Sequence, residues 1–450
     1  MPRIRVSKPL VELMREFKPE TISLMSKYKS TNSDGNYLHW NEFKWRVEKG
    51  DDEVAAWTAT KLSRQGISKS LVTLQADRDR YFSYCVPNSL TAKLHLIDRL
   101  TGGGSKISDG LLMSTQDKSR YLVKSLMIEE AITSAQLEGS STTREIAKEM
   151  IQKGLKPKDK SQQMIFNNYL LMTKAIEKKN EELSIDFILE LHEIATHQAI
   201  ENNAVAGELR QEDNIVITNL YNENPFYPPA ADTLPSRLTH LCDFANTDHS
   251  DREPNNFIHP IVKAIILHFM IGYIHPFGDG NGRTARALFY WSIIKSGYWL
   301  FEYVSISKLI QEKRNDYDKS FIYTETDDFD ITYFIYNQVE TICRAVKLLN
   351  EYVDRKQKDF YDFMDWVDKS PISKKLKREQ LEILKEAMRS PGREFTAKQM
   401  SADFGITSNT ARKYLNELVE LNLLVQSTKK TGKAVVYLAP ANLKSKLNKS

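Results

Sequence analysis

A short polar run between two apolar segments constrains this chain of 450 residues more than any other feature. Residues 261–274 are almost unbroken apolar sequence, long enough for a buried helix, and Ala287 begins another apolar segment. Between them stands His275-Pro276-Phe277-Gly278-Asp279-Gly280-Asn281-Gly282-Arg283-Thr284-Ala285-Arg286. The pattern predicts a helix, a tight loop, and a second helix that begins around Gly280 to Gly282.

The residue types in this loop predict a nucleotide site. The first amides of a helix have no acceptor within the helix, and glycines on both sides of Asn281 let the backbone approach a ligand closely. We therefore expect the loop to hold phosphate oxygens. Arg283 and Arg286 are three residues apart, so both guanidinium groups can reach one polyphosphate. Asp279 is a hard oxygen ligand, which suits Mg2+ shared between one carboxylate and the phosphates.

His275, at the end of the first helix, is the natural general base for a hydroxyl nucleophile. Alone, a His-Pro-Phe run is more often a turn than a catalytic site, and a Gly-x-Gly run is weak evidence for any function. Here the base, the carboxylate, the glycines and the two arginines stand together between two helices. That context disfavours a purely structural role for the run.

At these residues the chain resembles the Fic family, whose pattern is His-Pro-Phe-x-(Asp/Glu)-Gly-Asn-Gly-Arg-x-x-Arg between two helices. Every fixed position of the pattern is present. The resemblance implies transfer of AMP from ATP to a Ser, Thr or Tyr hydroxyl of a target protein or of the chain itself. The roles that it implies are base for His275, metal ligand for Asp279, α-phosphate contact for Asn281 and the amides of Gly280 and Gly282, and β- and γ-phosphate contacts for Arg283 and Arg286.

A second element lies upstream, where Ser134-Ala135-Gln136-Leu137-Glu138-Gly139 closes a helical stretch. Ser134 and Glu138 are one turn apart on one face, and Gly139 is a helix-stopping residue. By itself, a Glu near the end of a surface helix is usually only solvated. Beside the Fic motif, the segment resembles the family's inhibitory helix, Ser/Thr-x-x-x-Glu-(Gly/Asn). The resemblance implies that Glu138 pairs with Arg286 in place of the γ-phosphate and keeps the resting enzyme largely off.

Two further segments resemble features of the family. Gly207-Glu208-Leu209-Arg210, followed by Ile215, Val216 and Ile217, resembles the flap, a short β-hairpin over the nucleotide that can pair with an extended target segment. The apolar triplet is also compatible with an ordinary core strand. The stretch around Tyr317 resembles the helix on the adenine side of the nucleotide, although it lacks the family's usual tandem tyrosine.

Length predicts about three domains, at the usual ~150 residues per domain. The three cysteines are far apart and indicate neither a disulfide framework nor a zinc cluster, which favours a reducing cytoplasm. The charged start of the chain has no secretory core, and no apolar run reaches ~18 residues. Neither export nor membrane spanning is expected.

The C-terminal segment is basic, since residues 371–450 contain 16 Lys/Arg and 7 Asp/Glu, a net charge of +9. Helices are expected over 380–388, 395–404 and 408–418, followed by a β-hairpin over 423–426 and 434–438 with a basic tip at Lys429 and Lys430. Three helices and a two-stranded wing resemble the winged-helix domain. Docking or a structural role is favoured over sequence-specific DNA binding, for which the candidate contacts are Ser408, Asn409, Arg412 and Lys413.

These features predict a mainly α protein. We expect a helical N-terminal region over 1–110 and a Fic helical core with a short β-hairpin flap over 111–350, with the inhibitory helix near 120–139. A linker over 351–370 and a winged-helix domain over 371–450 follow.

The function that the sequence favours is an autoinhibited protein adenylyltransferase that uses ATP and Mg2+. An alternative on the same fold is removal of AMP from a modified target, with Glu138 orienting a water. A third is a winged-helix DNA-binding regulator whose Fic-like core only senses nucleotide, although sensing would not require the base His275. The target protein, the preferred nucleotide and the oligomeric state, a homodimer included, are left open.

Overall fold

The computed structural model describes residues 4–77, 79–101, 116–200, 204–217, 226–249, 256–369, 373–389, 392–427, 435–440, 442–443 and 446. These residues are mostly helical, so the predicted fold class is confirmed. The chain divides into two compact units, Met1–Leu349 and Asn350–Ser450, which are described separately below.

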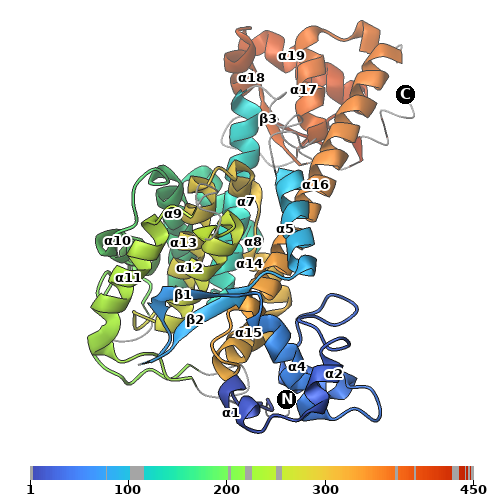
Figure 1. Cartoon of the computed structure of the whole chain (residues 1–450). Coiled ribbons are helices and arrows are strands. Elements are labelled where there is room, and N and C mark those ends of the chain that lie inside the picture. Colours follow the sequence, from blue (N-terminus) through green and yellow to red (C-terminus); the bar gives the residue numbers. More distant parts are fainter. Residues whose placement is uncertain are drawn as a thin grey trace. The chain divides into compact units, whose positions relative to one another are not determined.

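Two apolar helices, α12 (Pro260–Ile274) and α13 (Asn281–Lys295), form the centre of the first unit. Nearly all of their side chains are buried, as expected for α12, which is apolar on every face, whereas α13 also buries Arg283 and Arg286. His259 caps the start of α12 with its ring, and Pro260 follows at the first helical position, where its missing N–H costs nothing. Around this pair lie α9 (Lys160–Glu177), α10 (Ile185–Thr196) and α11 (Leu234–Asn246) (Figure 1).

The predicted inhibitory segment is the end of a long helix, α7 (Gln116–Leu137), which packs against α9 and α8 (Arg144–Lys153). Ile128, Ile132 and Ala135 supply its buried face. Gly139 stands just beyond the helix with φ +98°, a conformation that favours glycine. The other face of α7 contacts α14 (Ser307–Glu312), so the helix is held from two sides.

The other helices of this unit are α1 (Leu10–Arg15), α2 (Glu20–Leu24), α3 (Trp40–Phe43), α4 (Glu53–Gln65), α5 (Asn88–Thr101), α15 (Arg314–Thr326) and the beginning of α16 (Thr332–Lys369). Short 3-10 turns are η1 (Lys44–Arg46), η2 (Ala231–Thr233) and η4 (Trp299–Tyr303).

The described residues contain no helix long and apolar enough to cross a membrane. The three cysteines are buried and free.

The N-terminal region is not purely helical as expected, because it contains an antiparallel hairpin of β1 (Ser68–Gln75) and β2 (Tyr81–Cys85). The register shifts between Leu71 and Gln75, so the apolar positions do not alternate regularly and the strand pattern is weak in the sequence. The hairpin is fixed to the core: β1 packs on α11, and the buried Tyr273 hydroxyl donates to the Ala76 carbonyl at 2.7 Å.

The second unit combines α17 (Arg378–Arg389), α18 (Ala397–Phe404) and α19 (Ser408–Glu420) with a small antiparallel sheet. Its strands, β3 (Glu394–Thr396), β4 (Val425–Gln426) and β5 (Val436–Leu438), lie in the order β3-β5-β4, and a 3-10 turn, η5 (Ser373–Lys375), precedes α17. The arrangement agrees with three helices and a hairpin, while the winged-helix identification stays a prediction. The basic tip at Lys429 and Lys430 lies outside the described residues.

Two expected boundaries in this part of the chain are wrong. The segment 351–370 was expected to be a linker, but α16 continues to Lys369, since no Gly or Pro interrupts its amphipathic pattern before Pro371. Phe363 and Trp366 of this segment join the hydrophobic core of the second unit. Phe395 does not begin a helix, because it lies in β3 opposite Tyr437 and α18 starts only after Thr396, whose hydroxyl caps it.

Candidate functional site

The loop between α12 and α13 is shaped by residues of the motif itself. His275 ends α12 in the left-handed conformation with φ +50°, and Gly280 turns the chain into α13 with φ +81°. The Asn281 side chain folds back on the loop, since its Oδ1 accepts from the Phe277 amide at 3.1 Å and its Nδ2 donates to the Phe277 carbonyl at 2.7 Å. These two hydrogen bonds close a tight loop at the N-terminus of α13.

The loop packs against the last turn of α10. The Nε2 atom of His192 lies 2.8 Å from the Asp279 carbonyl oxygen, and its ring stacks on Phe277 with centroids 3.7 Å apart. Gly280 lies against Thr196, whose Cγ2 would be 2.6 Å from a side-chain carbon at that position. No sequence pattern distinguishes His192, since a histidine on an apolar helix is usually a core residue.

The candidate base His275 lies at the junction of α12 and the loop, with its Nδ1 3.3 Å from the Gly272 carbonyl oxygen. Burial lowers the pKa of His275 to about 4, and the charge of Arg210 adds to this. The imidazole is therefore neutral near pH 7, the form that can accept a proton.

Arg210 holds the backbone on which this histidine sits. Its amide donates to the Pro276 carbonyl at 3.0 Å and its Nε donates to the His275 carbonyl at 2.9 Å. The same guanidinium bonds to Asp213 and to the Pro229 carbonyl, so it joins the motif to both sides of the predicted flap.

Arg283 and Asp279 form a pair at the start of α13. The Arg283 side chain is 1% exposed; its Nη2 lies 3.1 Å from Asp279 Oδ1, and its Nη1 donates at 2.6 Å to the Ala195 carbonyl at the end of α10. The Arg283 Nε has no hydrogen-bond partner among the described residues. Asp279 Oδ1 also accepts from the Gly280 amide at 2.6 Å.

A metal ion at Asp279 would have few protein ligands. No cluster of three or more metal-ligating side chains occurs in the described part of the chain. The Asp279 carboxylate is 23% exposed, so it can still contact a ligand. A single accessible carboxylate beside a phosphate loop fits Mg2+, which usually retains waters and shares its remaining ligands with a nucleotide.

Arg286 is buried, and its guanidinium is occupied by the end of α7. Its Nη2 lies 2.9 Å from Glu138 Oε1, and its Nε donates to the Ser134 hydroxyl at 2.9 Å. Burial alone would raise the pKa of Glu138, but the positive charges of Arg286, Arg283 and Arg314 outweigh it, so the pKa is lowered and the carboxyl is ionised. Arg314 also donates to the Leu137 carbonyl at 3.3 Å, which places a third arginine at this helix end.

The Glu138 carboxylate lies directly over Gly282. A side-chain carbon added at Gly282 would overlap Glu138 Oε1 and lie 3.1 Å from Arg286 Nη1. The absence of a side chain at Gly282 therefore leaves room for an anion at the N-terminus of α13, and the carboxylate of α7 fills that room.

A buried glutamate on α7, which sequence reasoning missed, anchors this helix. Glu130 is 2% exposed, and its carboxylate accepts from the Ser307 hydroxyl at 2.5 Å, the Ser307 amide at 3.1 Å and the Ser305 hydroxyl at 2.7 Å. These donors stand at the start of α14. The pattern offered no signal because donor and acceptor are about 175 residues apart.

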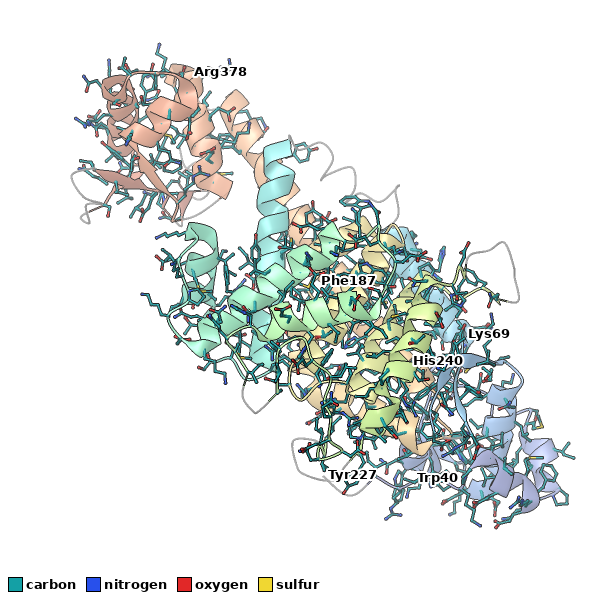
Figure 2. All side chains as sticks on the ribbon, turned by 90° about the vertical axis from the view of Figure 1, so that its left-hand side faces the viewer. Trp40, Lys69, Phe187, Tyr227, His240 and Arg378 are labelled. Atoms are coloured by element: carbon teal, nitrogen blue, oxygen red, sulfur yellow. The ribbon has the colours of Figure 1, made fainter. Side chains whose placement is uncertain are left out.

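The predicted flap is only partly described. Ile217 forms an isolated antiparallel bridge with Phe226, with N···O distances of 2.9 and 2.8 Å, and residues 218–225 between them lie outside the described residues. Ile215 and Val216 precede the bridge without regular secondary structure, and Val216 is 46% exposed. Tyr227, directly after the bridge, is exposed on the surface (Figure 2).

Tyr317, the predicted adenine-side residue, packs into an aromatic cluster with Phe321 and Phe334. Its hydroxyl lies 3.1 Å from Nε2 of the buried His268. Tyr317 also forms part of the wall of a cavity of about 660 Å3 between residues 36–46 and 309–344. The structure thus gives this tyrosine a packing role, and its contact with a base stays a prediction.

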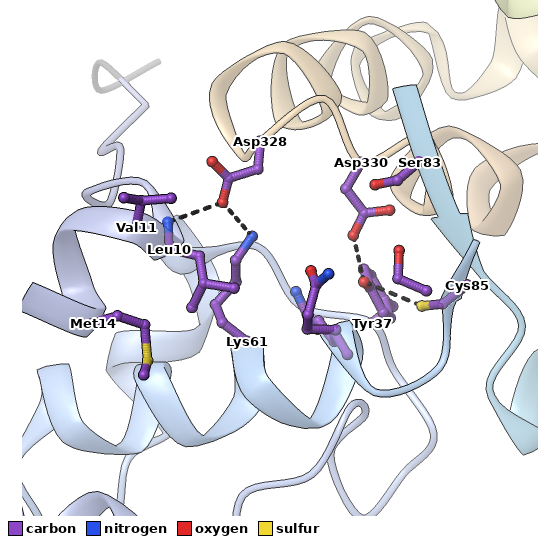
Figure 3. Close-up of a pocket in the computed structure, with 12 residues that line it drawn as sticks. Leu10, Val11, Met14, Tyr37, Lys61, Ser83, Cys85, Asp328 and Asp330 are labelled. Carbon is purple, nitrogen blue, oxygen red and sulfur yellow. Dashed lines mark hydrogen bonds and ion pairs between the residues drawn. The ribbon is translucent and has the colours of Figure 1, made fainter. Parts of the chain in front are cut away.

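A second cavity, of about 500 Å3, lies between the N-terminal region and residues 328–330 (Figure 3). Leu10, Val11 and Met14 line one side of it, and Lys61 bonds to Asp328 within it. Neither of these two cavities includes a residue of the 275–286 loop.

Comparison with known proteins identifies the central part of the chain. Residues 182–293 match the Fic/DOC family. Protein adenylyltransferase fic-1 of Caenorhabditis briggsae is 33% identical over 123 residues, which cover 27% of this chain and 22% of that protein. Protein adenylyltransferase Fic of Nematostella vectensis is 31% identical over 121 residues, or 27% of this chain and 25% of that protein.

A solved structure agrees over a longer range. A Fic family protein from Desulfovibrio desulfuricans G20 covers 79% of this chain and 97% of its own length, with a TM-score of 0.52 and 19% identity. At that identity the likeness shows the fold alone. The match to the curated relatives spans about a quarter of their length or less.

Proposed function

The chain contains a domain of the Fic/DOC family, and from this premise we propose that it is a protein adenylyltransferase, which transfers AMP from ATP to a protein hydroxyl. The observation that carries the proposal is the arrangement around α13. A neutral imidazole, an accessible carboxylate and two buried arginines surround a helix N-terminus whose anion position is free of side chains from the helix itself. Such an N-terminus is suited to bind phosphate.

In the proposed reaction, His275 removes the proton from a Ser, Thr or Tyr hydroxyl, and the oxygen attacks the α-phosphorus of ATP. A bond forms between that oxygen and phosphorus, the bond to the bridging oxygen breaks, and pyrophosphate leaves. Asn281 and the amides of Gly280 and Gly282 would contact the α-phosphate, and Arg283 and Arg286 the terminal phosphates. Mg2+ held at Asp279 would neutralise phosphate charge when bound.

In the arrangement described here, the resting chain would be inhibited. Glu138 occupies the Arg286 guanidinium and the space over Gly282, both of which a γ-phosphate would need. Because one guanidinium edge cannot serve both anions, ATP would bind weakly or in an unproductive pose. Activation would require α7 to withdraw its last turn.

Two other functions share parts of this geometry. Removal of AMP from a modified target would use the same groups, with Glu138 orienting a water instead of excluding the γ-phosphate. A DNA-binding regulator is favoured only by the second unit, where α19 exposes Ser408, Asn409, Arg412 and Lys413 beside a net positive charge. Docking or a structural role for this unit remains our preferred proposal, since exposed charge alone does not specify DNA.

One experiment tests the proposal directly. The chain and its Glu138→Gly variant are incubated with Mg2+ and ATP labelled either in the α-phosphate or in the γ-phosphate. We expect label in protein only from the α-labelled nucleotide, and much more with the variant. Label from the γ-phosphate would indicate phosphorylation, and release of AMP from pre-modified protein by the unsubstituted chain would favour the reverse reaction.

A further inference from the structure

His192 connects two segments that any transfer reaction at this site must hold together. The residue is completely buried on the last turn of α10. Its Nδ1 lies 3.0 Å from the amide nitrogen of Gly207, where the flap segment begins, and its Nε2 lies 2.8 Å from the Asp279 carbonyl oxygen. One ring therefore spans from the flap base to the phosphate loop.

The two partners determine the protonation of this ring. A backbone N–H can only donate, so Nδ1 of His192 must be the acceptor and carry no proton. A carbonyl oxygen can only accept, so Nε2 must carry the proton and donate to Asp279. The imidazole is the neutral Nε2–H form, and a charged ring would break the bond to Gly207.

The ring also has no freedom to turn. It stacks on Phe277 with the two planes 3° apart, and Gly280 packs against its edge. A substituent at Gly280 would lie 3.2 Å from the Cδ2 atom of His192. The geometry of the two hydrogen bonds is thus fixed by packing as well as by the partners.

We propose that His192 is a positioning residue for the transfer reaction: its neutral ring sets the flap base and the Asp279 loop at a fixed separation. This inference rests on the proposed function. The loop side determines how Asp279 and the first amides of α13 meet the nucleotide, and the flap side determines where an extended target segment presents its hydroxyl. A displacement of about 1 Å between these two sides is enough to slow a reaction about 100-fold.

Substitution of His192 by asparagine or glutamine can remove its two hydrogen bonds one at a time. The Oδ1 of an asparagine takes the place of Nδ1, so His192→Asn retains the acceptor for Gly207 and loses the donor to Asp279. The Nε2 of a glutamine takes the place of the ring Nε2, so His192→Gln retains the donor and loses the acceptor. His192→Ala loses both. All three are made in the Glu138→Gly background, where transfer is expected to be measurable.

His39 provides a matched control in the same unit. It is buried, it stacks on Tyr323 with centroids 4.2 Å apart, and both of its ring nitrogens are bonded, to the Asn41 amide and the Thr326 hydroxyl. His39→Asn should lower the melting temperature about as much as His192→Asn. It should not change the kinetic constants, because its hydrogen bonds involve neither the flap base nor the 275–286 loop.

Self-modification is measured against ATP and Mg2+ concentration. We expect His192→Asn to raise the KM for ATP about tenfold with a smaller change in kcat. His192→Gln should lower kcat about tenfold and leave the KM for ATP within about twofold. Hydrogen exchange of the peptide around Gly207 should accelerate in the Gln and Ala variants and not in the Asn variant.

The outcomes separate the two proposals. Equal exchange at Gly207 in all variants, or equal kinetic losses in the Asn, Gln and His39 variants, would overturn the positioning role. If the Glu138→Gly parent transfers no AMP, the proposed function is wrong, while the exchange pattern still decides whether His192 holds the flap base.

Discussion

The carboxylate of Glu138 lies 2.9 Å from the guanidinium of Arg286, although the two residues are 148 positions apart in the sequence. The Arg286 side chain is 2% exposed and the Glu138 side chain 28% exposed, so the ion pair is at the edge of the core. A partly accessible carboxylate can leave, whereas the buried arginine cannot follow it. The pair is therefore suited to open from the α7 side.

Substitution of either partner should give opposite results if inhibition acts through Arg286. Glu138→Gly should raise self-modification at least about tenfold, which corresponds to about 1.4 kcal/mol, because it frees the guanidinium for the γ-phosphate. Arg286→Ala should not activate, and the double variant should be as inactive as Arg286→Ala alone. Activation by both single substitutions would instead indicate that α7 had merely loosened. Rates and ATP affinities of the four proteins decide this.

Gly282→Ala should be inactive even when Glu138 is replaced. In the parent chain the new methyl group would overlap the Glu138 carboxylate, whereas in the Glu138→Gly background it would occupy the anion position itself. The loss of thermal stability should therefore be larger in the parent than in the Glu138→Gly background, a non-additivity that a double-mutant cycle measures. Additive stability effects would contradict contact between these two positions.

His275→Ala in the Glu138→Gly background should lower transfer at least ~100-fold, the typical contribution of a general base, and leave ATP affinity nearly unchanged. Since burial lowers the pKa of His275 to about 4, the ring is already neutral above that pH. The rate should therefore be nearly flat from about pH 6 to 8, and the acid limb should lie well below the ordinary histidine pKa of about 6.5. An acid limb near pH 6.5 would exclude this environment for the base.

Glu130→Ala should raise the proposed transfer activity partially, because it removes the anchor of α7 and leaves the donors of Ser305 and Ser307 without their acceptor. Leaving buried donors unpaired costs about 1–3 kcal/mol each, so the melting temperature should fall as well. Glu129→Ala, the neighbouring position, loses only an ion pair with the exposed Arg144 and serves as the control. Equal activity of the parent and Glu130→Ala would show that the anchor does not contribute to inhibition.

The position of a C-terminal truncation should decide whether the remaining chain folds and stays soluble. Cutting after residue 370 leaves Phe363 and Trp366 without the core in which they are buried, whereas cutting after Leu349 removes the whole second unit. We expect the Glu138→Gly form of 1–349 to stay soluble and modify itself, and 1–370 to aggregate. Any binding of the full chain to duplex DNA should weaken steeply with salt and be absent from 1–349. Failure of 1–349 to fold would make the second unit part of the catalytic unit.

The sequence allowed the motif loop to be placed because its information is local. Apolar segments of helical length flank 275–286, and glycines mark the turn, so the helix–loop–helix follows from periodicity. The family resemblance, which the match of residues 182–293 supports, then directed attention to Glu138, a residue that its own neighbourhood did not distinguish.

The supports of the loop could not be found in this way. His192, Arg210 and Glu130 act through hydrogen bonds that reach residues up to 177 positions away, and each of the three bonds to a backbone carbonyl or amide, which no residue pattern encodes. The hairpin β1–β2 was missed because its bulge interrupts the alternation that identifies a strand. The boundary at 351–370 was wrong because charged residues on an exposed helical face resemble a linker.

Glu138 occupies the anion position over Gly282, so variants that lack its carboxylate should differ from the parent in stability as well as in activity. Removing the carboxylate leaves the buried Arg286 without its partner, while Arg283 and Arg314 keep Asp279 and Asp318, and an unpaired buried cation is strongly destabilising. A variant without the carboxylate should therefore be less stable and more readily unfolded and degraded than the parent. Binding of phosphate, pyrophosphate or ATP at Arg286 should restore its stability. Selection for a stable protein would then favour the inhibited chain, which retains Glu138, even without selection against the transfer activity.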